Sequence, residues 1–154
     1  MFNITMNRID GLDCIYCGDR ATCRDHVVPF SYDSIAERTA ADFPHTNIVP
    51  ACNNCNVTLG NIFIVNIAER AAYLHKTLET KNKKILSQPE WSKEDMKHLT
   101  GSLKKTITAL AVKRNIIKER LSHMENMSKN HTLNPKDYWE IMLEEDGVVT
   151  ETEL

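Results

Sequence analysis

Residues 14–17 read Cys-Ile-Tyr-Cys, and residues 52–55 read Cys-Asn-Asn-Cys. Each pair presents two thiolates from one tight turn, and two such turns complete the tetrahedral set of sulfur ligands that zinc prefers. A redox dithiol would need only one pair, and disulfides would be unstable in a reducing cytosol. Because sulfur fills all four positions, the predicted zinc is structural rather than catalytic. The predicted ligands are Cys14, Cys17, Cys52 and Cys55.

The composition is that of an ordinary globular protein. The chain has 154 residues, of which 42% are hydrophobic and 26% charged, so one modest core is expected. The longest strongly apolar run, residues 62–65, is far too short to cross a bilayer, and the N-terminus lacks the pattern of a signal peptide. We therefore expect no membrane association and a cytoplasmic location, which is the host cytoplasm if a phage encodes the chain.

Charge is spread unevenly along the chain, although the formal net charge is only −2. Residues 1–75 carry 5 basic and 8 acidic side chains, residues 76–126 carry 12 basic and 6 acidic, and residues 127–154 carry 2 basic and 7 acidic. A basic middle segment suits a phosphate backbone, because neutralising phosphates supplies most sequence-independent affinity for nucleic acid. A solvated, lysine-rich helix face is the alternative.

The chain is predicted to be α+β, with a zinc module at residues 1–61. Two short β-like runs, residues 21–30 and 47–51, are separated by a loop at 31–46 with one helical turn near 34–41. From Asn53 the pattern turns helical, and apolar side chains recur every seven residues before Pro89.

A second helix should start after Trp91, with Ser92 as its N-cap. Its apolar stripe consists of Met96, Leu103, Leu110, Ile117 and Met124. The two helices are expected to form an antiparallel hairpin over residues 62–126 that makes homodimer contacts, DNA contacts or both. Residues 127–154 should hold a short helix beginning at Asn134-Pro135 and an acidic tail.

Asp25-His26 lies between the two cysteine pairs. A carboxylate can hold a hard cation, and an imidazole titrates near neutral pH, so the pair offers what metal-assisted hydrolysis needs. An isolated Asp-His dipeptide is weak evidence, since a salt-bridged or surface pair is commoner. Its position between two zinc-binding pairs is what makes it a candidate site.

The order Cys-x2-Cys, Asp-His-x-x-Pro, Asn, then Cys-x2-Cys followed at once by Asn resembles the HNH, or ββα-metal (His-Me finger), endonucleases. The match runs from Cys14 to about Asn61 and looks closest to zinc-containing phage proteins of the endonuclease VII group. The resemblance implies a ββα-metal module and a hydrolase that cleaves DNA phosphodiester bonds, leaving a 5′-phosphate and a 3′-hydroxyl.

The same resemblance implies roles for four residues. His26 would be the general base, Asp25 and Asn56 would ligate one catalytic Mg²⁺ or Mn²⁺, and Asn47 would pin the loop that orients His26. Successive strand residues point to opposite faces, so Asp25 and His26 can serve one site only at a strand end or bulge. The lysine usual shortly after the final Asn is missing, so one phosphate contact is either absent or supplied from elsewhere, by Arg20, Arg24 or a lysine of the basic segment.

Two other interpretations compete with a nuclease. The first is a catalytically inactive zinc ribbon that binds nucleic acid or protein without cutting. The joint presence of Asp25, His26 and Asn56 argues against it. The second, a thiol redox protein, would need an exposed Cys-x2-Cys pair and has no other support.

Overall fold

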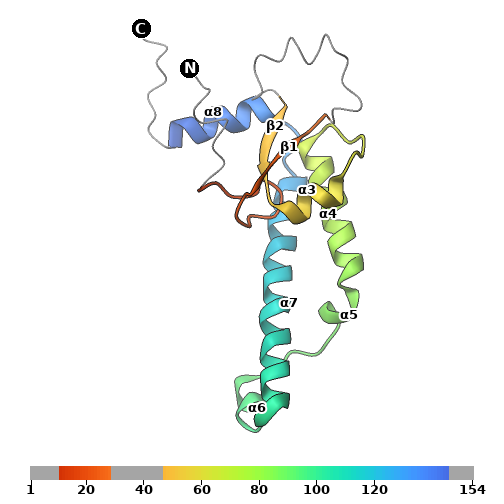
Figure 1. Cartoon of the computed structure of the whole chain (residues 1–154), viewed down its shortest axis with the longest axis vertical. Helices are drawn as coiled ribbons and strands as arrows, with labels where there is room; N and C mark the ends of the chain where they lie inside the picture. The colour runs from red at the N-terminus through yellow and green to blue at the C-terminus, as the bar shows by residue number, and fades with distance from the viewer. Residues whose placement is uncertain (1–10, 29–46, 146–154) are drawn as a thin grey trace.

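The computed structural model describes residues 11–28 and 47–145 and shows a mixed α+β architecture. Strand β1 (Cys23–His26) pairs antiparallel with β2 (Ile48–Ala51), with Cys23 opposite Ala51 and His26 opposite Ile48. Six described helices follow this small sheet (Figure 1). They are α3 (Asn53–Leu59), α4 (Ile67–Lys81), α5 (Lys83–Leu86), α6 (Lys93–Lys97), α7 (Gly101–Ser128) and α8 (Pro135–Glu145).

Strand β1 is shorter than the sequence predicted. The Ala21 amide donates to the Leu12 carbonyl and the Thr22 amide to the Ala51 carbonyl, so these two residues join the first cysteine turn to the sheet. The predicted loop at 31–46, with its helical turn near 34–41, lies outside the described residues.

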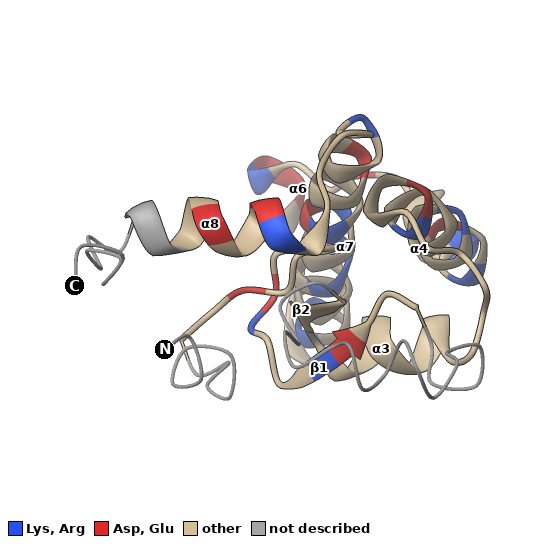
Figure 2. Ribbon diagram, turned by 90° about the horizontal axis from the view of Figure 1, so that it is seen from above, with Lys and Arg blue, Asp and Glu red and all other residues tan. Residues whose placement is uncertain are grey.

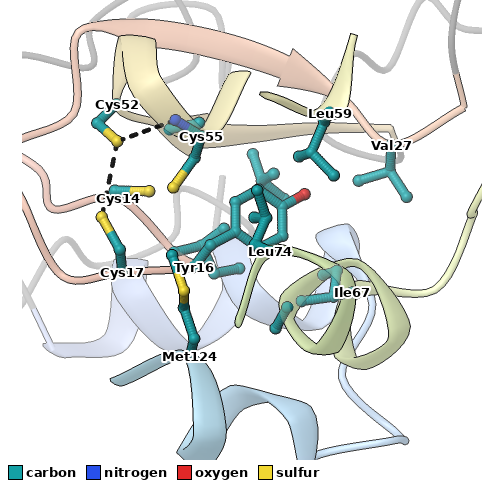
Figure 3. Close-up of a cluster of buried hydrophobic side chains, with 14 residues drawn as sticks. Cys14, Tyr16, Cys17, Val27, Cys52, Cys55, Leu59, Ile67, Leu74 and Met124 are labelled. Carbon is teal, nitrogen blue, oxygen red and sulfur yellow. Dashed lines mark hydrogen bonds between the residues drawn. The ribbon is translucent and has the colours of Figure 1, made fainter. Parts of the chain in front are cut away.

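The main buried core surrounds the four cysteines (Figure 3). The Tyr16 ring lies at its centre, between the cysteine turn and the inner faces of α4 and α7, where Leu74 and Met124 contribute. The residue after β1, strand β2 and α3 complete it with Val27, Val49, Ala51 and Leu59. Burial of this apolar surface fixes the first cysteine turn, the sheet and three helices as one packed unit.

The predicted helical hairpin is present, because α4 and α7 lie side by side over part of their lengths (Figure 1). Its seam is buried only near the cysteines. On α7, Ile117 and Met124 are buried, whereas Leu103 is 57% and Leu110 36% exposed. The described part of the chain therefore leaves Leu103 largely uncovered and Leu110 partly uncovered.

Both predicted long helices are interrupted at glycine. The helix that starts at Asn53 ends at Gly60, which has a φ of +51°, and α4 begins again at Ile67. Ser92 caps α6 through the Asp95 amide, as predicted, but α6 stops at Lys97 and α7 starts at Gly101, whose φ is +66°. Positive φ is incompatible with a continuing right-handed helix, which explains both breaks.

Helix α8 begins at Pro135, as the Asn134-Pro135 pair predicted, and the Asn134 side chain accepts a hydrogen bond from the Asp137 amide. Trp139 is buried and anchors α8 to the sheet, because its Nε1 donates to the Ile48 carbonyl at 2.7 Å. Among the described residues, no helix has the length and apolar character needed to cross a membrane.

Candidate metal centre and catalytic site

The four predicted cysteines meet in space, and their sulfurs all lie within 4.8 Å of one another. All four are buried, and in Figure 3 their sulfurs face a common centre. The Cys17 and Cys52 sulfurs are 3.6 Å apart. A tetrahedral site with Zn–S bonds of about 2.3 Å requires sulfur separations of about 3.8 Å. The donor set and its spacing thus fit one structural zinc ion.

Short-range backbone geometry shapes the two turns. Cys52 is the N-cap of α3, and its sulfur accepts from the Cys55 amide at 3.4 Å. Gly18 follows the first pair with a φ of +77°, and a Cβ placed there would lie 2.8 Å from Nδ1 of His123 on α7. Only glycine meets both conditions without strain. The first turn can therefore pack directly against α7.

The electrostatics of the four sulfurs favour a bound cation. Hydrogen bonding with Cys14 raises the pKa of Cys55 above its ordinary value, whereas hydrogen bonding with the same residue lowers the pKa of Cys17 and that of Cys52, so the cluster shares its protons unevenly. A coordinating zinc ion deprotonates its thiol ligands outright. Arg120 on α7 adds a positive charge at the edge of the cluster, where its Nη2 donates to the Cys55 sulfur at 3.8 Å.

Asp25 is buried and forms an ion pair with Arg70 of α4. Both carboxylate oxygens accept from Arg70 Nη2 at 2.8 Å, and Oδ2 also accepts from the Tyr16 hydroxyl. Burial, followed by the charge of Asp25, raises the pKa of Tyr16 well above its ordinary value, so this hydroxyl keeps its proton. The first cysteine turn, β1 and α4 are thereby joined through one buried polar cluster.

Arg70 is fully buried and donates five hydrogen bonds, two of them from Nη2 to the two oxygens of the same carboxylate. Besides the two bonds to Asp25, Nε donates to the Tyr16 hydroxyl at 2.9 Å, and Nη1 donates to the carbonyls of Val27 and Ile64 at 3.0 and 2.8 Å. Two of these partners, Asp25 and Val27, are the residues on either side of His26. The guanidinium therefore fixes the chain on both flanks of the predicted general base.

The ion pair limits what Asp25 can offer a cation. Two carboxylate oxygens have about four acceptor positions. Three hydrogen bonds occupy one position on Oδ1 and two on Oδ2, so one position on Oδ1 remains. The role of Asp25 as a cation ligand stays a prediction, and its structural role in the buried cluster is a finding that the sequence pattern did not suggest.

His26 is the last residue of β1 and is partly buried. It is still paired in the sheet, opposite Ile48. Asn47 secures the backbone just beyond it. Its carbonyl accepts from the Val27 amide at 2.9 Å, its Oδ1 accepts from the Val28 amide at 2.7 Å, and its Nδ2 donates to the Val28 carbonyl at 3.0 Å.

Asn56 follows Cys55 on α3 and is partly buried. Its amide donates to the Cys52 carbonyl at 3.0 Å, and this hydrogen bond closes the first turn of α3, which begins at Asn53. Helix α3 contacts β1, which places Asn56 and His26 on two adjoining elements. The described residues thus contain a strand pair followed directly by a helix.

Sequence reasoning missed Arg70 and Tyr16. The signal for Arg70 was available, because it stands between Ile67, Ala71 and Leu74 on the buried side of α4. A lone arginine in such an apolar stripe needs buried acceptors. Tyr16 lay inside the first cysteine turn, but nothing in the local sequence identified its partners.

Comparison of the chain with protein-family models, with curated proteins and with solved structures finds no match. The resemblance to HNH endonucleases therefore rests on the motif residues alone.

Proposed function

We propose that the chain is a metal-dependent endonuclease of the HNH type that hydrolyses DNA phosphodiester bonds. The observation that carries the proposal is the joint placement of three features. The cysteine cluster sets the start of α3, His26 ends β1, and Asn56 follows Cys55 on the helix that contacts β1.

In the proposed reaction, neutral His26 accepts a proton from a water molecule, and the resulting hydroxide attacks phosphorus. The bond from phosphorus to the 3′ oxygen breaks, and that oxygen takes a proton from solvent, which leaves a 3′-hydroxyl and a 5′-phosphate. A bound Mg²⁺ or Mn²⁺ supplies charge stabilisation for the departing oxygen. Because the base must be neutral, the rate should fall as the pH drops and the ring gains a proton.

The proposed cation ligands are the Asn56 side-chain oxygen and the remaining acceptor position on Asp25 Oδ1. Two protein ligands leave the other coordination positions to water and phosphate oxygens, which is how Mg²⁺ is usually held. The Arg70 guanidinium weakens the attraction of Asp25 for a cation, since the two positive charges compete for the same carboxylate. The proposed site should therefore bind Mg²⁺ weakly in the absence of DNA.

A catalytically inactive zinc ribbon that binds nucleic acid or protein is the second candidate. The Asp25–Arg70 ion pair favours it, because a carboxylate with three hydrogen bonds can serve stability alone. Zinc binding and packing would be the same in both cases, so only cleavage separates them.

A plasmid-cleavage assay tests the proposal. The purified, zinc-loaded protein should nick or linearise supercoiled DNA with Mg²⁺ or Mn²⁺, and His26→Ala should lose this activity. Zinc content and the midpoint of thermal unfolding should stay near wild type in the variant. An inactive wild-type protein that still binds DNA would favour the binding module, and an active His26→Ala would remove His26 as the base.

The predicted homodimer is a further part of the proposal. Exposed apolar side chains along the first half of α7 suit a second copy, and they include Leu103, Leu110, Val112 and Ile116. Light scattering during size-exclusion chromatography should then give twice the chain mass, and a monomer at all concentrations would exclude the dimer.

A further inference from the structure

A groove of about 400 Å³ lies where α3 meets α4 and α7. Figure 1 shows α3 across the upper ends of these two helices. Asn53, Asn54, Val57 and Thr58 of α3 line the groove, together with buried residues of the core that include Cys55, Leu74 and Met124.

The lining of this groove is basic and contains no acidic side chain. Lys81 comes from α4, and Lys113 and Arg120 come from α7. Figure 2 shows that Lys and Arg occur along both of these helices. The chain as a whole is slightly acidic, with a net charge of −2, so a groove lined by three cations and no anion is a local concentration of positive charge.

Arg120 joins the groove to the cysteine cluster. Its Nη2 donates to the Cys55 sulfur, whereas its Nε is buried without a hydrogen-bond partner in the described part of the chain. That Nε atom is buried and out of reach of a ligand in the groove, so the contribution of Arg120 to the groove is the positive charge of its guanidinium.

The polar lining fits a sugar–phosphate backbone. Lysine, arginine, asparagine and threonine are the side chains that usually contact phosphates, and the groove offers all four. Val57 and Ile116 add exposed apolar surface that can pack on sugars. No aromatic residue lines the groove, so it lacks a platform on which unpaired bases stack.

We propose that this groove binds the phosphate backbone of duplex DNA and so supplies the phosphate contact that is missing after Asn56. The inference rests on the proposed function for its choice of DNA. It identifies α3 as a shared element, because one side of this helix carries Asn56 and another lines the groove. Binding there would be independent of base sequence and would weaken steeply with salt.

Two matched double variants test the proposal by fluorescence anisotropy with a labelled duplex and no added divalent cation. Lys81→Gln with Lys113→Gln removes two charges from the groove. Lys104→Gln with Lys105→Gln removes two charges from the exposed start of α7, outside the groove. Zinc content and thermal unfolding of both variants should match wild type, because all four side chains are exposed.

The groove variant should raise the Kd for duplex DNA about tenfold at 0.1 M salt. It should also lower the slope of log Kd against log salt by roughly 1 to 2, since each lost phosphate contact is worth ~0.9. The control variant should stay within a factor of about two of wild type in Kd. The proposal would be overturned if both variants weakened DNA binding equally, or if the groove variant did not weaken it at all.

The same assay separates this inference from the proposed nuclease. If the wild-type protein never cleaves DNA but the groove variant loses DNA binding, the groove proposal stands and the nuclease proposal fails. If the groove variant still cleaves DNA and its Kd for the duplex is unchanged, the nuclease proposal stands and the groove proposal fails. A polyglutamate competitor that displaces the duplex as well as unlabelled DNA does would identify an acidic protein partner instead and overturn the choice of DNA.

Discussion

The zinc end of the molecule and the distal half of α7 (residues 101–116) are built on different principles. The zinc end comprises residues 11–28 and 47–59 with the adjoining parts of α4 and α7, and it buries both apolar and polar groups. The distal half of α7 lies away from the zinc end (Figure 1), and it exposes much of its apolar stripe. Buried polar clusters fix a unique geometry, whereas an exposed apolar stripe is a surface that a binding partner can cover. Precise chemistry is therefore expected only at the zinc end.

Loss of the zinc site should have the largest effect, because it should unfold the zinc end and so abolish the difference between the two regions. Cys14→Ser, or treatment with a strong chelator, should unfold the zinc end, because structural zinc sites contribute on the order of 10 kcal/mol to folding. Acidification should act in the same direction, since zinc stabilises the fold at neutral pH and is released as the thiolates gain protons. Metal analysis and circular dichroism measure both outcomes.

Cys23→Ser is the control for this experiment. Cys23 is partly buried and lies outside the four-sulfur cluster, so the variant should keep about one zinc per chain. A Cys14→Ser protein that retains zinc and wild-type stability would show that the cysteines do not hold the zinc end together.

Removal of the buried guanidinium should have the next largest effect. Arg70→Met leaves the Asp25 carboxylate buried without its cation, which should lower the free energy of unfolding by about 3–5 kcal/mol. Arg70→Met combined with Asp25→Leu should cost less than the single change, because no unpaired charge remains. Urea denaturation compares the two. A single variant within about 1 kcal/mol of wild type would mean that the zinc end does not depend on this cluster.

A matched pair of leucines compares the two regions directly. Leu74 is 2% exposed in the core of the zinc end, and Leu103 is 57% exposed on the distal half of α7. Leu74→Ala should cost about 2–5 kcal/mol of unfolding free energy, and Leu103→Ala less than about 0.5 kcal/mol. If Leu103→Ala instead lowers stability in a concentration-dependent way, a second copy covers the distal half, and the contrast belongs only to the single chain.

Local sequence patterns were sufficient for the two cysteine turns, the two strands and three of the six described helix starts. Each Cys-x2-Cys pair, Ser92 and Asn134-Pro135 acts within a few residues, so its local geometry follows from the sequence nearby. The apolar repeat placed α4 and α7 together, but it could not reveal that Leu103 stays uncovered, because a periodic stripe says nothing about which partner covers it.

The buried polar cluster escaped prediction for a different physical reason. Arg70 is 45 residues from Asp25 and 54 from Tyr16, so their pairing depends on how α4 packs against the first cysteine turn. Asp25 was predicted to be a cation ligand from its place beside His26 between the cysteine pairs and from the resemblance to HNH endonucleases, and that role stays a prediction. The structure shows a different, internal role for this carboxylate, which accepts three hydrogen bonds from Arg70 and Tyr16.

Chemical rescue of His26→Ala tests the central claim most directly. Cleavage of supercoiled plasmid by the zinc-loaded variant should be lost with Mg²⁺ and should return as free imidazole is added, because imidazole can replace the missing general base. The recovered rate should rise with the concentration of neutral imidazole. Cleavage by His26→Ala at the wild-type rate without imidazole would contradict the account.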